Sequence, residues 1–187
     1  MRIISGFFKG KKILEPKDFK TRPLKDLTKE SIFNIINHSN KFSIEIKNSN
    51  ILDLFSGVGS FGIECLSRGS KHVTFIENYK GVLPILRQNL FNLKSIKNFS
   101  VIEKDIIKDF EFNLSPEKFD IIFLDPPFKE KNLSKILVNI HYKKILKNNG
   151  LVIIHRYKKE NDELPNDFKI LEEKIYGISK IIFGLFI

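Results

Sequence analysis

The sequence predicts an α/β protein with a doubly wound, Rossmann-like sheet of about seven mostly parallel strands. From residue 51 onward, short apolar runs alternate with longer helical patterns, as in parallel sheets covered by helices. Glycines and acidic residues follow several of these runs, where open sheets bind ligands. The last two apolar runs predict a terminal antiparallel strand. We expect a basic hairpin and helix extension over residues 1–40 and one α/β domain over residues 41–187.

The N-terminal extension is predicted from a basic segment and one amphipathic helix. Two short runs, residues 2–6 and 12–14, flank Gly6 and Gly10 and predict a short hairpin. Pro23 marks a break. Thr28 is then predicted to be the N-cap of a helix that runs from Lys29 to about His38.

The remaining elements follow in order from hydrophobic periodicity. Strands are expected at 50–52, 71–77, 99–102, 119–124 and 151–154. Helices are expected from the glycine-rich loop to residue 68, at about 80–93 with Pro84 in the first turn, and at 132–146. A short helix and a loop are expected between residues 105 and 118. Runs 168–176 and 180–186, separated by Gly177, predict an antiparallel pair.

Composition favours a cytosolic protein with a polyanionic partner. The 187 residues carry a net charge of +10, and residues 1–25 hold eight basic side chains against two acidic ones. A biased use of lysine is the alternative explanation for this charge. Cys65 is the single cysteine, so no intrachain disulfide is possible. No apolar run is long enough for a membrane span, and the N-terminus has no secretory pattern.

The glycine-rich loop after the first strand predicts a nucleoside-binding turn. Gly57, Gly59 and Gly62 have the spacing G-x-G-x-x-G between a strand and a helix. Glu77 ends the next strand 20 residues after Gly57, where a carboxylate commonly binds ribose hydroxyls. The loop lacks the G-K-[ST] sequence of a phosphate-binding loop, which argues against a kinase or NTPase.

A second loop, Asp125-Pro126-Pro127-Phe128, follows the strand at 119–124. Two prolines fix the backbone and remove two donors, leaving a carboxylate, carbonyl oxygens and one aromatic ring. This set suits a planar amine that is held by acceptors while its ring stacks on Phe128. We expect the two loops to face each other where the strand order reverses. Asp105, after the third strand, is a further acceptor on the cofactor side. Because this side lacks basic residues that would pair with phosphates, an adenosyl cofactor without phosphates fits best.

These motifs resemble the class I S-adenosylmethionine-dependent methyltransferases, and more narrowly the RsmD-like family that modifies a guanine N2 amine of 16S ribosomal RNA. The resemblance rests on residues 1–6, 21–23, 30–35, 53–62, 67–69, 77, 125–128 and 176–177. His155 departs from it, because many relatives are expected to have an acidic residue there.

The resemblance implies a role for each site residue. Catalysis would rest on Asp125, the Pro126 carbonyl and Phe128. The methionine amino group would lie near Asp53 and the ribose near Glu77, in a cofactor site formed by Asp53, Phe55, Gly57, Gly59, Glu77, Asn78, Asp105 and Ile106. The RNA-binding residues would be Arg2, Lys9, Lys11, Lys12 and Arg22.

Three other functions stay open from the sequence: an adenine-N6 methyltransferase on RNA or DNA, a nicotinamide-dependent oxidoreductase, and a non-catalytic RNA-binding factor. The expected partner is 16S rRNA or the assembling small ribosomal subunit, with the protein acting as a monomer and without a membrane. The histidines His38, His72, His141 and His155 have no metal-binding spacing, so no metal is expected.

Overall fold

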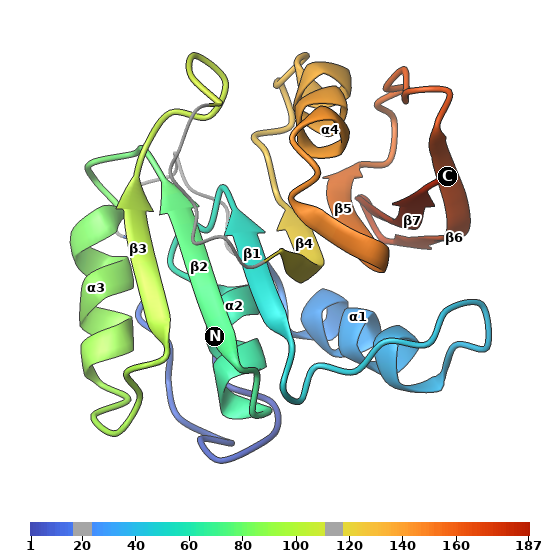
Figure 1. Cartoon of the computed structure of the whole chain (residues 1–187). Coiled ribbons are helices and arrows are strands. Elements are labelled where there is room, and N and C mark those ends of the chain that lie inside the picture. Colours follow the sequence, from blue (N-terminus) through green and yellow to red (C-terminus); the bar gives the residue numbers. More distant parts are fainter. Residues whose placement is uncertain (17–23, 111–117) are drawn as a thin grey trace.

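The computed structural model describes residues 1–16, 24–110 and 118–187, and its centre is one seven-stranded sheet in the order β3-β2-β1-β4-β5-β7-β6 (Figure 1). The strands are β1 (Asn50–Leu54), β2 (His72–Glu77), β3 (Phe99–Glu103), β4 (Phe119–Leu124), β5 (Leu146–Tyr157), β6 (Phe168–Tyr176) and β7 (Ser179–Phe186). The first five are parallel, and β7 pairs antiparallel with both β5 and β6. The predicted doubly wound sheet and its terminal antiparallel pair are therefore confirmed.

Helices cover both faces of the sheet because successive side chains of each strand point to opposite faces. In β4, Ile121 and Phe123 belong to one buried cluster, whereas Ile122 and Leu124 belong to the other. The first cluster lies under α1 (Asp26–His38), α2 (Ser60–Ser67) and α3 (Leu83–Phe91), and the second lies under α4 (Leu133–Tyr142). Figure 1 shows α4 apart from the other three helices.

The N-terminal segment is part of the main core. Gly10 N donates to Ile3 O and Ile13 N donates to Met1 O, so the predicted short hairpin is confirmed. Ile3 and Ile13 are each 1% exposed and pack in the same cluster as α1 and α2. This packing fixes the path of the chain before α1.

Several predicted boundaries were wrong. Helix α1 begins at Asp26, and Thr28 is buried within it instead of capping it. An acidic side chain in the first turn is favourable there because it complements the helix dipole. Residues 106–108 form a turn instead of a short helix, and most of the loop predicted before residue 118 lies outside the described residues.

The junction of α4 and β5 also differs from the prediction. Helix α4 ends at Tyr142, and β5 already begins at Leu146. The expected break at Asn149 is a register shift inside the strand, because Phe119 pairs with Leu146 while Ile121 pairs with Leu151. Asn149 has a φ of 61°, which is the left-handed conformation that asparagine tolerates. None of the helices in residues 1–16, 24–110 and 118–187 is long and apolar enough to cross a membrane.

Candidate active site

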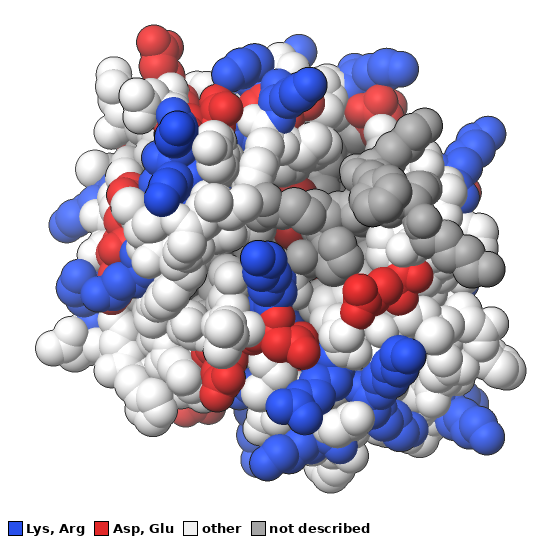
Figure 2. Space-filling view, turned by 180° about the vertical axis from the view of Figure 1, so that it is seen from behind, with Lys and Arg blue, Asp and Glu red and all other residues white. Residues whose placement is uncertain are grey.

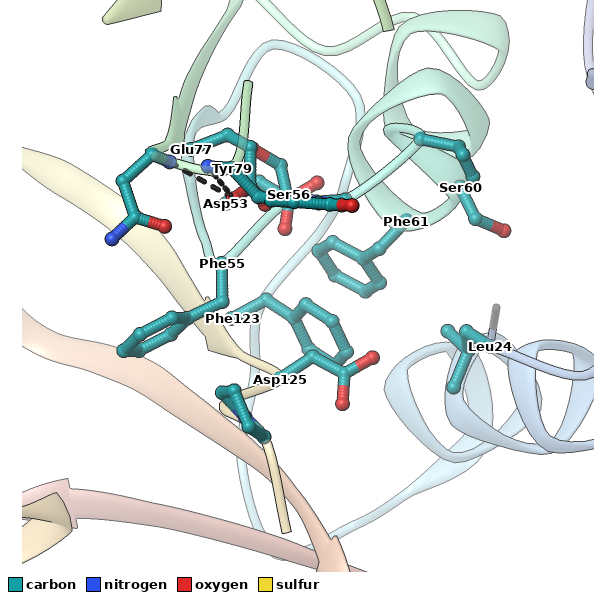
Figure 3. Close-up of a pocket in the computed structure, with 14 residues that line it drawn as sticks. Leu24, Asp53, Phe55, Ser56, Ser60, Phe61, Glu77, Tyr79, Phe123 and Asp125 are labelled. Atoms are coloured by element: carbon teal, nitrogen blue, oxygen red, sulfur yellow. Dashed lines mark hydrogen bonds between the residues drawn. The ribbon is translucent and has the colours of Figure 1, made fainter. Parts of the chain in front are cut away.

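A cavity of about 260 Å³ lies at the carboxyl ends of β1, β2 and β4, where the strand order reverses (Figure 3). Strands β1 and β4 are direct neighbours, so the glycine-rich loop and the Asp125 loop meet across this cavity, as the sequence predicts. The lining residues are Leu24, Asp53, Phe55, Ser56, Gly57, Val58, Ser60, Phe61, Glu77, Asn78, Tyr79, Phe123, Asp125 and Pro127. Three of them are carboxylates and, among these lining residues, none is basic.

Asp53 is a buried carboxylate with one unsatisfied oxygen. Gly62 N donates to its Oδ2 at 3.0 Å, whereas its Oδ1 has no hydrogen-bond partner among the described residues. Burial raises the pKa of Asp53 well above its ordinary value, and the charges of Asp125 and Glu77 raise it further. Ser60 Oγ is likewise buried and without a partner among the described residues. The cavity therefore holds an unused acceptor and an unused hydroxyl.

Glu77 holds the glycine-rich loop in place. Its Oε2 accepts from Gly57 N at 2.7 Å, and its Oε1 accepts from the backbone N–H groups of Asn78 and Tyr79 at 2.9 and 2.8 Å (Figure 3). A carboxylate has about four acceptor positions, so these three bonds leave one position on Oε2 for a ligand hydroxyl.

The three glycines of the loop have different tasks. Gly57 has a φ of 54° and lines the cavity. Gly59 faces α3 instead, because an added Cβ would lie 2.5 Å from Leu86 Cδ1. A Cβ on Gly62 would lie 2.3 Å from the Phe75 ring, so this glycine permits α2 to pack closely on β2.

An aromatic stack forms the apolar wall of the cavity. The ring centroids of Phe61 and Phe123 lie 4.1 Å apart at an interplanar angle of 15°. The ring of Phe33, in α1, also stacks on Phe61, with a centroid separation of 5.2 Å. Phe61 and Phe123 both line the cavity. Helix α1 therefore supports the site through its aromatic packing, although it contributes no polar group to the lining.

The Asp125 loop is held at its first residue by a histidine. His155 Nδ1 lies 2.8 Å from Asp125 Oδ1, and His155 Nε2 lies 2.8 Å from Ser179 Oγ. The Phe128 ring, at the end of the same loop, stacks on Tyr157 with a centroid separation of 5.2 Å. It also meets His155 edge-on at 5.9 Å.

Arg156, the next residue of β5, holds the backbone of the same loop. Its Nη1 donates to Pro127 O at 3.2 Å, and its Nη2 donates to Glu130 O at 2.9 Å. The same side chain makes a two-point contact with Asp162, at 2.8 Å through Nε and 2.7 Å through Nη2. Because Arg156 is fully buried, these bonds form away from water.

The structure brings together most, but not all, of the predicted cofactor residues. Five of them line the cavity: Asp53, Phe55, Gly57, Glu77 and Asn78. Asp105 is outside the lining, and its Oδ1 accepts from Ile107 N at 3.1 Å within its own turn. Ile106 is 3% exposed and packs in the cluster under α4.

On the catalytic side, Asp125 lines the cavity, but Pro126 is buried and Pro127 takes the lining position. Phe128 does not line this cavity. Sequence reasoning missed Ser60, Tyr79 and Arg156. A serine beside a glycine motif and a tyrosine two residues after Glu77 are visible in the sequence, but nothing local predicts a fully buried arginine.

The turn of the N-terminal hairpin lies at the end of α2 that is remote from the cavity. Phe7 N donates to Ser67 O at the last residue of α2, whereas Ser60, at the first residue, lines the cavity. The eight residues of α2 span about 12 Å between these two ends. Arg2, Lys9, Lys11 and Lys12 are exposed, and Phe7 is 88% exposed. Arg22 lies outside the described residues.

Basic side chains on the face of the molecule that Figure 2 shows form more than one group. Figure 2 shows them near the upper edge and again near the lower edge, the end where the N-terminal segment lies in Figure 1. Within residues 1–16, 24–110 and 118–187, no group of three or more histidine, cysteine or acidic residues is arranged to hold a metal ion.

Comparisons with known proteins give a consistent family. The family model described as Conserved hypothetical protein 95 matches residues 1–184. YlbH of Bacillus subtilis, a candidate rRNA methyltransferase, is 33% identical over 97% of this chain and 96% of its own. Ribosomal RNA small subunit methyltransferase D of Haemophilus influenzae is 34% identical over 95% of this chain and 90% of its own. The solved structure of yhhF from Escherichia coli, a candidate methyltransferase, superposes with a TM-score of 0.81 at 26% identity, covering 98% of this chain and 96% of that one.

Proposed function

Because the chain belongs to the family described as Conserved hypothetical protein 95, the RsmD-like methyltransferases, we propose that it methylates the exocyclic N2 amine of a guanine in small-subunit ribosomal RNA, with S-adenosylmethionine as the donor. The observation that carries this proposal is the convergence of Asp53, Glu77 and Asp125 in one cavity that has no basic lining residue among those described.

The residues of the cavity fit this donor. Three carboxylates and no cation suit a ligand that is positively charged and carries no phosphate. Asp53 Oδ1, buried and without a partner among the described residues, is an acceptor for the amino group of the methionine moiety. The remaining acceptor position of Glu77 is suited to one ribose hydroxyl. The donor, when bound, supplies an electrophilic methyl group on a sulfonium.

Asp125 is the residue that activates the amine. The lone pair of a guanine amine is delocalised into the ring, so the amine is a poor nucleophile. A carboxylate that accepts an N–H bond from the amine localises this lone pair and stabilises the positive charge that develops on nitrogen. The proline-stiffened loop holds the carboxylate at the cavity wall, which supplies orientation. The base must leave any helix to reach this site.

The test is transfer of a labelled methyl group to small-subunit particles and to naked rRNA, followed by mass spectrometry of the labelled nucleoside. We expect N2-methylguanosine, and we expect Asp125→Asn to lower the rate by about 100-fold or more. Asp109→Asn is the matched control, because Asp109 pairs with Lys104 outside the cavity. N6-methyladenosine as the product would favour the alternative, an adenine methyltransferase. No transfer to any RNA would refute the proposal.

Lys9, Lys11 and Lys12, which are exposed in the N-terminal hairpin, are the proposed contacts to rRNA phosphates. Changing Lys9, Lys11 and Lys12 together to Gln should weaken RNA binding and reduce the slope of log K against log salt by about 2–3, because each lost phosphate contact contributes about 0.7–0.9. A filter-binding titration at several salt concentrations measures this slope. An unchanged slope would show that these lysines are only a solvated surface.

A further inference from the structure

His155 contacts the first and the last side chain of the Asp125 loop, Asp125 and Phe128. Its ring is 4% exposed and its Nδ1 lies 2.8 Å from Asp125 Oδ1. The centroids of the Phe128 and His155 rings lie 5.9 Å apart at an interplanar angle of 75°. The other ring nitrogen, Nε2, lies 2.8 Å from the hydroxyl of Ser179, the first residue of β7. One imidazole thus connects the carboxylate, the aromatic ring and the antiparallel strand.

Asp125 determines which nitrogen of the neutral imidazole carries the hydrogen, and the hydroxyl of Ser179 adapts to it. An ionised carboxylate accepts hydrogen bonds only, so Nδ1 must carry a hydrogen to bond Asp125. In the neutral ring Nε2 is then an acceptor, and it receives the hydroxyl hydrogen of Ser179. In the charged ring both nitrogens donate, and Ser179 Oγ accepts. The bond from His155 to Asp125 is therefore retained in both protonation states.

This bond leaves Asp125 with one free oxygen. Within the described residues, Oδ1 is the carboxylate oxygen of Asp125 that forms a side-chain hydrogen bond, and Oδ2 forms none. The bond to Oδ1 restricts rotation of the carboxylate, so Oδ2 samples a narrower range of directions in a side chain that lines the cavity. Because a carboxylate that rotates freely would present Oδ2 to the amine only part of the time, its orientation contributes directly to the rate.

We propose that His155 is a positioning residue that orients the Asp125 carboxylate, so that Oδ2 receives the N–H of the substrate amine. This inference rests on the proposed methyl transfer and adds a residue to it. Asp125 sets the tautomer of His155 and Ser179 holds the ring through Nε2. The strand pair β5–β7 sets the place of both side chains, because Tyr157 pairs with Ser179 and His155 pairs with Ile181.

The kinetic test compares three variants. His155→Asn keeps a donor near the position of Nδ1, His155→Leu removes the donor at similar size, and Ser179→Ala removes the contact to Nε2 that helps to hold the ring. We expect His155→Leu to lower kcat by about 10-fold to 100-fold while the Kd for S-adenosylmethionine stays within about twofold. His155→Asn should recover most of this loss, and Ser179→Ala should lose a smaller part. A wild-type kcat in His155→Leu, or an equal loss in His155→Asn with an intact fold, would overturn the proposal.

A spectroscopic test does not depend on methyl transfer. Nitrogen-15 NMR of the wild-type protein, with the His155 signals assigned by comparison with His155→Asn, shows which ring nitrogen keeps its hydrogen at high pH. We expect Nδ1–H for His155. Finding Nε2–H instead would refute the proposed positioning role. If Nδ1–H is found but no RNA is methylated, the proposed function fails while the hydrogen-bond arrangement stands.

Discussion

Replacing Arg156 by methionine should destabilise the protein much more than removing an exposed ion pair nearby does. The buried pair is Arg156–Asp162 and the exposed pair is Lys131–Glu160. Arg156 is 0% exposed and its partner Asp162 is 10% exposed, so the substitution leaves a carboxylate and two carbonyls unpaired with little access to water. Removing one partner of such a pair costs about 3–5 kcal/mol. We expect the lower end of this range, about 3 kcal/mol, because the Asp162 side chain retains some exposure.

The matched control is Lys131→Met. Lys131 pairs with Glu160 at 2.9 Å, but its side chain is 77% exposed. Exposed pairs contribute about 0–1 kcal/mol. Urea unfolding of both variants gives the two free energies of unfolding, and steady-state assays give their rates. Equal losses of stability in the two variants would refute the reasoning, because burial would then not determine the strength of the contact.

Arg156→Met should also slow the reaction more than Lys131→Met does. Arg156 holds Pro127 O, so its loss allows the Asp125 loop to shift, and a displacement of about 1 Å at a reacting group costs about 100-fold in rate. Arg156→Lys is informative here, because one ammonium lacks the planar fork that reaches Asp162 and two carbonyls at once. We expect an intermediate rate for this variant. A wild-type rate in Arg156→Lys would show that the loop does not need the fork.

Two further predictions concern the N-terminal segment and the cavity. Gly6→Ala should destabilise the protein by about 1–3 kcal/mol more than Gly10→Ala in urea unfolding. Both glycines have a φ near +85°, but an added Cβ at Gly6 would lie 1.9 Å from Ser67 O and at Gly10 would meet nothing within 4 Å. Equal losses would show that backbone strain alone sets the cost. Asp53→Asn should remove a destabilisation of the folded protein that arises when the buried Asp53 carboxyl ionises. The raised pKa means that the stability contribution of Asp53 is full below the ordinary value of 3.8 and falls as pH rises through the folded-state pKa. The difference in free energy of unfolding between Asp53→Asn and the wild type, measured without ligand, should therefore move in favour of the variant as pH rises from the ordinary pKa to the folded-state pKa. A difference that stays constant with pH would contradict the raised pKa of Asp53.

The sequence by itself determined the alternation of strands and helices, the glycine-rich loop, and the placement of Asp53, Glu77 and Asp125 at strand ends. These features are local, because periodicity, glycine spacing and proline restrict the backbone within a few residues. The helix start at Thr28 and the end of α4 were predicted wrongly, since tertiary packing decides how far a marginal helix extends.

The tertiary structure alone decided which side chains meet. His155 and Ser179 lie 24 residues apart, and the pairing of β5 with β7 brings their side chains together. The sequence placed His155 at a strand end but did not predict its contact with Asp125 across the β4–β5 pair. The N-terminal lysines are likewise seen in the sequence, whereas the place of the hairpin turn follows from the hydrogen bond of Phe7 N to Ser67 O at the end of α2. The register of β5 against β4 and β7 depends on packing between distant segments, and no local pattern in the sequence specifies it.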